Sequence, residues 1–180
     1  MPTFPIAGSL LPTSGILSYL YQRSADHAHR GIDIPAKKGT PVLAARTGVV
    51  EQASSVWKQG FSGYGRHVVI RHPRDERTLY AHLDTVSVKP GQAVQEGAKI
   101  GTVGDTAFTA AGGYTDSIKS GGPHVHFEVS PRPYPQPSEA SRLDPVAWLT
   151  GSGGGLVTLA TLAALGWAAV KLGRRLRSAS

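Results

Sequence analysis

Two histidines, His124 and His126, lie one residue apart in the run HVHFEV (124–129). Alternate side chains of a β-strand point to the same face. We therefore expect both imidazoles and Glu128 on one face of a strand, with the apolar residues between them directed into a core. A single histidine in a strand is usually structural, but two on a polar face are candidates for metal binding or acid–base catalysis.

A second pair of residues that could bind a metal, His29 and Asp33, occurs in HAHRGIDIP (27–35). Gly31 and Pro35 argue against a helix here, but an even spacing also places two side chains on one face of a strand. With a histidine from a distant strand, the pair would form a site with nitrogen and oxygen ligands, which suits Zn²⁺ with an open fourth position for water. Both spacings are common by chance, so spacing alone leaves a structural role open.

His82 ends a predicted strand in LYAHL (79–83). It is either a half-buried core residue or a base or transition-state donor beside the metal. Of the remaining histidines, His27 is expected at the rim of a groove. His67 and His72 flank an apolar strand and are expected on the surface.

Short strands separated by turns must position these residues. The chain of 180 residues has 22 Gly, 13 Pro and only 7% aromatic residues, which favours a turn-rich β domain over a helical bundle. No long amphipathic helical period occurs before residue 145. The polar stretch between Gly104 and Gly122 is expected to be a loop with a role in binding. Tyr64 and Tyr114 are candidates to border a substrate groove.

The composition limits both the chemistry and the partners. The chain has no Cys, which excludes disulfides and thiolate metal sites, so a metal must be held by His, Asp or Glu. The net charge of +7 indicates attraction to an anionic partner such as an acidic wall polymer. No dense cluster of basic and aromatic residues occurs in the body of the chain, so no nucleic acid partner is expected. The sequence does not indicate the oligomeric state.

Composition divides the chain into five regions. They are an N-terminal strand and loop leading into the domain (1–25), a β domain (26–149), a Gly/Ser hinge (150–155), a predicted transmembrane helix (156–172) and a basic tail (173–180). The strictly apolar part, 156–170, would span about 22 Å as a helix against roughly 30 Å of hydrocarbon, so flanking residues must complete the span. The alternative is a buried or docking helix. The basic tail favours a membrane helix, with the C-terminus in the cytoplasm and the β domain outside.

Several motifs along residues 15–149 occur in the order typical of one protein family. They are HRGID (29–33), GYG…VVIRH (63–72), YAHL (80–83), VKPGQAVQEGAKIGTVG (88–104), SGGPHVHFE (120–128) and DPVAWL (144–149). In these motifs the chain resembles the lysostaphin/LytM-type zinc endopeptidases (peptidase family M23), which cut the peptide cross-links of bacterial peptidoglycan. The loop between Gly104 and Ser120 is longer than the connection usual in that family, which leaves the substrate preference open.

The resemblance implies a mostly β fold, an antiparallel β-sheet peptidase domain with a groove. It implies one Zn²⁺ ion bound by His29, Asp33 and His126, with His82 and His124 as the catalytic pair. Such a pair can deprotonate a water, stabilise an oxyanion and protonate the leaving amine, and the sequence does not divide these steps between the two. The implied partner is a peptidoglycan peptide, and the bond that is cut, Gly-Gly or D-Ala to a diamino acid, is left open.

Three functions are compatible with these features. The first is a membrane-anchored zinc endopeptidase with its catalytic domain facing the bacterial cell wall. The second is a non-catalytic wall-binding or activator module of the same fold; such relatives lose metal ligands, whereas all five expected positions are filled here. The third is a structural membrane protein whose β domain is a spacer. An apolar tail helix without a recognisable secretory signal further predicts a virion-associated lysin in the membrane of a phage particle, rather than an enzyme of the host cell envelope.

Overall fold

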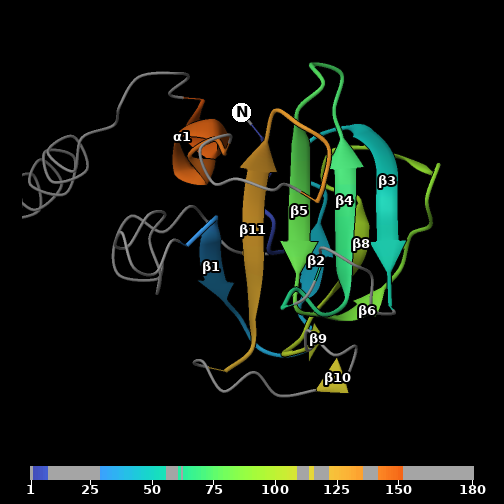
Figure 1. The fold of residues 1–180 in the computed structure, drawn as a ribbon, viewed down its shortest axis with the longest axis vertical. Coiled ribbons are helices and arrows are strands. Elements are labelled where there is room, and N and C mark those ends of the chain that lie inside the picture. Colours follow the sequence, from blue (N-terminus) through green and yellow to red (C-terminus); the bar gives the residue numbers. More distant parts are fainter. Residues whose placement is uncertain are drawn as a thin grey trace, which may run out of the picture.

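Short strands make up most of the regular structure in the computed structural model (Figure 1). The structure describes residues 2–7, 29–55, 61, 63–108, 114–115, 122–135 and 142–151. Its elements are β1 (Ile32–Pro35), β2 (Pro41–Leu43), β3 (Gly48–Ser54), β4 (His67–Arg71), β5 (Arg77–Ala81), β6 (Leu83–Val86), β7 (Ala93–Val94), β8 (Lys99–Val103), β9 (Ala107–Phe108), β10 (Tyr114–Thr115), β11 (His124–Ser130) and α1 (Pro145–Thr150).

The strands form one large sheet and two small ones. The large sheet has six strands in the order β1-β11-β5-β4-β3-β7, a second sheet has the order β2-β8-β6, and β9 pairs with β10. Every pair in these sheets is antiparallel. In Figure 1, β11, β5, β4 and β3 lie side by side, with β1 beside β11. The predicted mostly β, antiparallel fold is therefore confirmed.

The alternation in β11 separates a core face from a polar face. Val125, Phe127 and Val129 belong to the main hydrophobic core. The ring of Phe127 lies 5.3 Å from that of Tyr80 and 6.3 Å from that of Trp148, measured between centroids. Burying a side chain of this size contributes about 1.5–3 kcal/mol. This packing fixes the register of β11, so the polar residues between the core residues must point to the opposite face.

A second apolar cluster covers the other face of the central strands. Its members are Phe61, Tyr64, Val69, Leu79, Ala81 and Tyr134. His67 is fully buried in this layer and stacks on Phe61 with 4.4 Å between ring centroids. His72 is also buried, beside Trp148. The expectation that His67 and His72 lie on the surface is therefore wrong, because segments distant in sequence cover both histidines.

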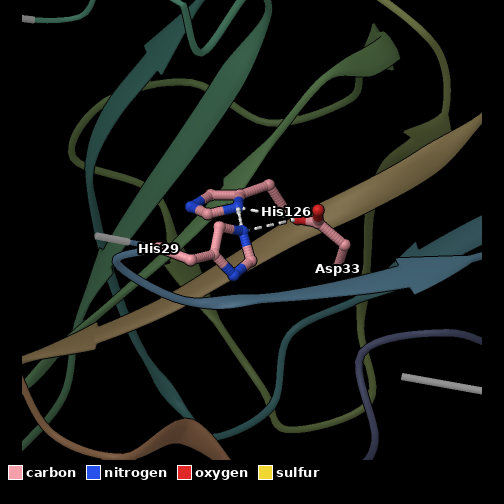
Figure 2. A group of neighbouring side chains, drawn as sticks. All are labelled: His29, Asp33 and His126. Atoms are coloured by element: carbon pink, nitrogen blue, oxygen red, sulfur yellow. Dashed lines mark hydrogen bonds and ion pairs between the residues drawn. The ribbon is translucent and has the colours of Figure 1, made fainter. Parts of the chain in front are cut away.

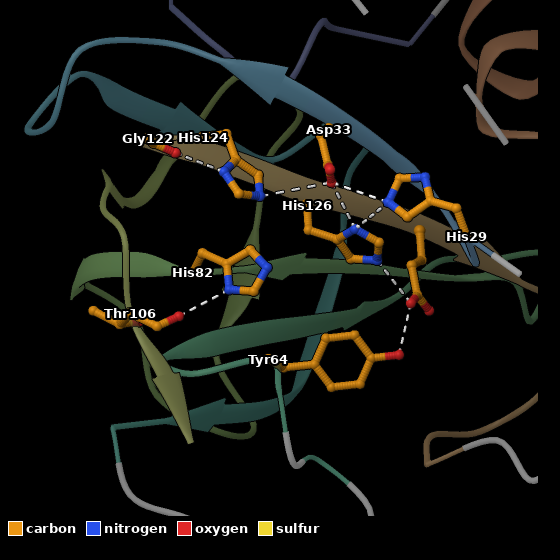
Figure 3. Close-up of polar contacts among 9 residues, drawn as sticks. His29, Asp33, Tyr64, His82, Thr106, Gly122, His124 and His126 are labelled. Atoms are coloured by element: carbon orange, nitrogen blue, oxygen red, sulfur yellow. Dashed lines mark hydrogen bonds and ion pairs between the residues drawn. The ribbon is translucent and has the colours of Figure 1, made fainter. Parts of the chain in front are cut away.

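His82 forms the junction between the large sheet and the three-stranded sheet. It is the single residue between β5 and β6, and its φ of 61° lies in the left-handed region. A residue other than glycine held there costs of order 1–3 kcal/mol. Backbone hydrogen bonds hold this turn, from the N–H of His82 to the carbonyl of Tyr64 (2.8 Å) and from Leu83 to Arg66 (3.0 Å). The turn directs the imidazole of His82 toward β11 (Figure 3).

The short helix α1 packs against the core after β11. Its N-cap, Asp144, accepts hydrogen bonds from two backbone N–H groups of the first turn, and Gly151 ends the helix in the left-handed conformation. No helix among the described residues is long and apolar enough to cross a membrane. The predicted hinge after residue 151, the predicted membrane helix and the basic tail lie outside the described residues and stay predictions.

The two other regions predicted to be irregular are described only in part. Within residues 1–25 the structure describes 2–7, where Ile6 is buried and bridges to Val42. The stretch between Gly104 and Gly122, expected to be a loop, contains the paired strands β9 and β10. Asp105 and Thr106 are also described, whereas residues 109–113 and 116–121 lie outside the described part of the chain.

Candidate metal centre

The pairing of β1 with β11 brings together the two segments that carry metal-binding residues. In this antiparallel register Asp33 lies opposite His126, and His29 precedes β1 by three residues. Gly31 lies between His29 and Asp33, where an added Cβ would be 2.2 Å from the carbonyl oxygen of Phe127. Only glycine permits this close approach, so Gly31 is what allows the His29 segment to reach the site.

Three ligand atoms converge in Figure 2. His29 Nε2 lies 3.2 Å from Asp33 Oδ1 and 3.1 Å from His126 Nδ1, and His126 Nδ1 lies 2.8 Å from Asp33 Oδ1. A tetrahedral zinc ion at 2.0–2.2 Å from each ligand would separate the ligand atoms by about 3.4 Å. The observed triangle is slightly smaller than this, so the three residues fit one zinc ion.

The hydrogen positions around His126 also favour a cation. Nε2 of His126 lies 2.9 Å from a carboxylate oxygen of Glu128, and a carboxylate paired with an arginine can only accept hydrogen bonds. Nε2 therefore carries the hydrogen, and Nδ1 presents a lone pair. That lone pair faces the carboxylate oxygen of Asp33 at 2.8 Å. Two electron-rich atoms at this distance repel each other unless a proton or a metal ion lies between them.

Asp33 is held in its ionised form. Burial by itself would raise the pKa of this carboxyl, but the neighbouring imidazoles of His126, His29 and His124 outweigh burial and bring the pKa well below its usual value. At neutral pH Asp33 is therefore a carboxylate, the form that binds a cation.

The other two predicted residues, His82 and His124, lie next to the triangle. Their ring centroids are 4.8 Å apart, and the ring of His82 is 5.9 Å from that of His126. Nδ1 of His82 donates to the carbonyl of Thr106 (2.8 Å), and Nδ1 of His124 donates to the carbonyl of Gly122 (2.9 Å) (Figure 3). Each ring therefore keeps Nε2 as an acceptor, and Nε2 of His124 lies 3.7 Å from Asp33 Oδ1.

His82 is a neutral imidazole at physiological pH. The loss of solvent around the ring lowers the pKa of His82 to about 3, and the neighbouring His126 and His124 act in the same direction. Because the ring is neutral and its Nδ1 already donates to Thr106, its Nε2 presents a lone pair that can accept a hydrogen bond.

An open hollow of about 220 Å³ gives access to these groups. Its lining residues are His29, Arg30, Gly63, Tyr64, His82, His126 and Glu128. Tyr64 was expected at the groove and does line it, whereas His27 and the side chain of Tyr114 lie outside what the structure describes. Sequence reasoning missed Arg30 and Thr106. Arg30 could have been noticed because it follows the ligand His29, whereas nothing local marks Thr106.

The structure thus brings all five predicted residues into one cluster. His29 and Asp33 come from the edge strand and the segment before it, His124 and His126 from β11, and His82 from the end of β5. Such an arrangement can hold one divalent ion on one side and transfer protons on the other.

The amino-acid sequence is similar to those of several known proteins. "Uncharacterized lipoprotein YgeR" of Escherichia coli is 34% identical over 144 residues, covering 80% of this chain and 48% of that protein. "Peptidoglycan DD-endopeptidase ShyC" of Vibrio cholerae is 42% identical over 101 residues, 56% of this chain and 20% of that protein. "Murein hydrolase activator NlpD" of E. coli is 35% identical over 125 residues, 69% of this chain and 28% of that protein. The chain thus spans at most about half the length of these relatives.

The fold matches solved structures as well. The catalytic domain of the antimicrobial peptidase lysostaphin from Staphylococcus simulans superposes with a TM-score of 0.57 at 25% identity, covering 74% of this chain and 90% of that domain. A sequence model of "Peptidase family M23" matches residues 27–141, which include all five clustered residues. The chain therefore belongs to peptidase family M23.

Proposed function

We propose that this chain is a zinc endopeptidase that hydrolyses peptide cross-links of bacterial peptidoglycan. The observation that carries the proposal is the convergence of His29, Asp33 and His126 on one point, with two further imidazoles beside it. The similarity to ShyC, a peptidoglycan DD-endopeptidase, and to lysostaphin, an antimicrobial peptidase, supports the same reaction class.

The five residues fall into two groups: three would hold a metal ion, and two would transfer protons. A zinc ion bound by the triangle would provide Lewis-acid activation of a water and of the scissile carbonyl. His82 and His124 each have Nδ1 fixed to a backbone carbonyl and Nε2 available. Each ring presents Nε2 as an acceptor, so the ring that takes a proton from the attacking water can then donate that same proton to the leaving amine. The bonds from Nδ1 to the backbone carbonyls leave Nε2 of both rings available for this transfer.

The surroundings of the site suit an extended peptide from an acidic polymer. The hollow is open rather than enclosed, and its lining includes Gly63, Tyr64 and Arg30. The net charge of +7 favours approach to an anionic wall.

Digestion of purified peptidoglycan tests the proposal directly. Walls of two cross-link types, one with glycine bridges and one with direct links to a diamino acid, are incubated with the protein, and the fragments are analysed by mass spectrometry. We expect new peptide termini in one of the two walls. After treatment of the protein with a chelator, we expect none in either wall. Hydrolysis that persists without metal would contradict the proposal.

The second candidate function is activation of another wall hydrolase, and the similarity to NlpD favours it. An activator would release no fragments by itself and would stimulate a partner enzyme. Metal analysis of the purified protein separates the two, because a catalytic zinc enzyme is expected to contain about one zinc ion per chain.

The location of the protein is proposed on separate grounds. YgeR is named a lipoprotein, which supports action at the cell envelope. We propose that the apolar stretch 156–172 tethers the domain to a membrane. Membrane fractionation of the full chain beside a chain ending after Gly151 tests this, since only the full chain should sediment with membranes. Carriage in a phage particle stays a prediction, which detection of the protein in purified virions would support.

A further inference from the structure

Glu128 lies directly behind a metal ligand and is completely buried. It shares the polar face of β11 with His126 and has no exposed surface. One carboxylate oxygen lies 2.9 Å from Nε2 of His126 and accepts a hydrogen bond of 2.6 Å from the hydroxyl of Tyr64. The other oxygen pairs with the guanidinium of Arg142. Figure 3 labels Tyr64 and His126, and its dashed lines include these two hydrogen bonds.

Arg142 lies one residue beyond the end of the family match. That match covers residues 27–141, and Arg142 precedes helix α1. Its guanidinium carbon lies 4.7 Å from the centroid of the Tyr134 ring, and its side chain is 1% exposed. A carboxylate buried as deeply as Glu128 is strongly destabilising unless a positive group is paired with it. Arg142 provides that pairing.

We propose that Glu128, held by Arg142 and Tyr64, is a positioning residue for the metal ligand His126. The inference rests on the proposed zinc site and goes beyond it. A neutral imidazole can carry its hydrogen on either nitrogen, and only a nitrogen without the hydrogen can bind a metal. Glu128 accepts the hydrogen at Nε2, so Nδ1 is kept free and pointed at Asp33 and His29. A carboxylate behind a metal-binding histidine typically improves metal affinity or activity 10–100-fold.

This arrangement also assigns a task to Tyr64. Tyr64 lines the hollow, where its hydroxyl could donate to a substrate. Its hydrogen is instead donated to Glu128. Tyr64 therefore acts through Glu128 and His126, and its removal should weaken metal binding as well as turnover.

A purely structural ion pair predicts a different result. If Glu128 and Arg142 only stabilise the fold, their replacement lowers the melting temperature without changing the metal site. Another partly buried carboxylate offers a matched control, because Glu76 accepts from Arg46 (3.0 Å) and from the indole N–H of Trp148 (2.8 Å). It lies just before β5, at the end of that strand opposite His82.

The experiment measures metal binding in the full-length protein. The zinc dissociation constant is determined by competition with a chromophoric chelator, and the Co²⁺-substituted protein is examined by visible absorption. For Glu128→Gln we expect zinc binding about 10–100-fold weaker and a changed cobalt spectrum. Tyr64→Phe should weaken binding less, by about tenfold or below. Glu76→Gln should lower the melting temperature and leave both metal readouts unchanged.

Substitutions of Arg142 add a rescue test. Arg142→Met leaves the buried carboxylate unpaired and should weaken zinc binding, whereas Arg142→Lys keeps the charge and should restore part of the affinity. If Glu128→Gln does not fold, Tyr64→Phe still decides, because it removes one hydroxyl and little volume. Wild-type zinc affinity and cobalt spectrum in both Glu128→Gln and Tyr64→Phe would overturn the inference.

The same measurements separate this inference from the proposed function. A wild-type protein that binds zinc tightly, loses affinity in these variants and cleaves no peptidoglycan would contradict the proposed activity and support the role of Glu128. A wild-type protein that binds no zinc would overturn both.

Discussion

Two buried histidines have opposite surroundings: His72, which directly follows β4, and His126, which lies in β11. Both nitrogens of His72 have neutral partners: Nδ1 contacts the carbonyl of Thr47 at 3.1 Å and Nε2 contacts the hydroxyl of Thr78 at 2.9 Å. His126 has an acceptor at Nε2, yet its Nδ1 faces further electron-rich atoms. Both ring nitrogens of His72 therefore have a hydrogen-bond partner. Between Nδ1 of His126 and the carboxylate oxygen of Asp33, by contrast, a cation or a proton must lie.

Burial and the direction of pKa shifts do not distinguish His72 from the histidines of the candidate site. His72 is 2% exposed and His126 is 7% exposed. Burial lowers the pKa of His72, as the loss of solvent does for His82 in the site. What differs is the partner of each ring nitrogen: both nitrogens of His72 have neutral partners, whereas Nδ1 of His126 faces a carboxylate oxygen.

The largest effect is expected from removing one corner of the triangle of ligand atoms, Nδ1 of His126. His126→Ala deletes Nδ1 and should abolish both bound zinc and hydrolysis, to the level of chelator-treated wild type. Elemental analysis of the purified variant and fragment release from peptidoglycan measure the two losses. Retention of stoichiometric zinc by His126→Ala would refute the assignment of this residue as a ligand.

The next largest effect should separate proton transfer from metal binding. His82→Ala and His124→Ala each leave the three ligand atoms in place, so both variants should keep zinc while kcat falls by about 10²–10⁴-fold. Steady-state kinetics with a synthetic cross-link peptide, together with zinc content, test this. If both variants lose zinc, the division between ligands and proton-transfer residues is incorrect.

Substitution of His72 should affect stability alone. His72→Leu leaves the carbonyl of Thr47 without this partner and should lower the free energy of unfolding by about 1–3 kcal/mol. Zinc content and kcat should match wild type. Denaturant titration gives the stability change, and a loss of activity in the folded variant would break the contrast between the two histidines.

The smallest effect is a pH dependence of stability that arises from His72. Its pKa in the folded chain is lowered from the model-peptide value of 6.5, with burial as the largest cause. As pH falls below 6.5, the unfolded chain binds the proton first, so stability is greatest above that pH and is lost toward the lower folded pKa. Unfolding measured at about pH 8 and about pH 5 should show a smaller difference in His72→Leu than in wild type. An equal difference would mean that other groups cause the dependence.

Local patterns predicted the strand that carries the site. The alternation of β11 has period two, and the structure places its apolar residues in the core and its polar residues on the other face. The convergence of His29 and Asp33 with β11 depends on strand register, which no local pattern contains. The family resemblance assigned these residues to one site because the family's motifs already contain the residues that strand pairing brings together.

Predictions that depended on contacts with other segments of the chain were less successful. His67 begins an apolar strand and looks peripheral in sequence, but the rings of Phe61 and Tyr64, which precede the strand, lie against it. The strands β9 and β10 are two residues each, too short for a period to be visible. Arg142 carries no local sign of its partner, because the burial that makes its pairing with Glu128 necessary exists only in the folded chain.

The burial of β11 has a consequence for hydrogen exchange. This strand is paired on both edges, with β1 and β5, and all seven of its residues are buried. Amides in such a position exchange with solvent only through large openings of the structure. Two of the five clustered residues, His124 and His126, are therefore held on a protected strand, while the hollow in front of them stays open. Loss of these two residues from the site on heating should follow the deuterium uptake of β11, because they leave it only when the sheet itself opens.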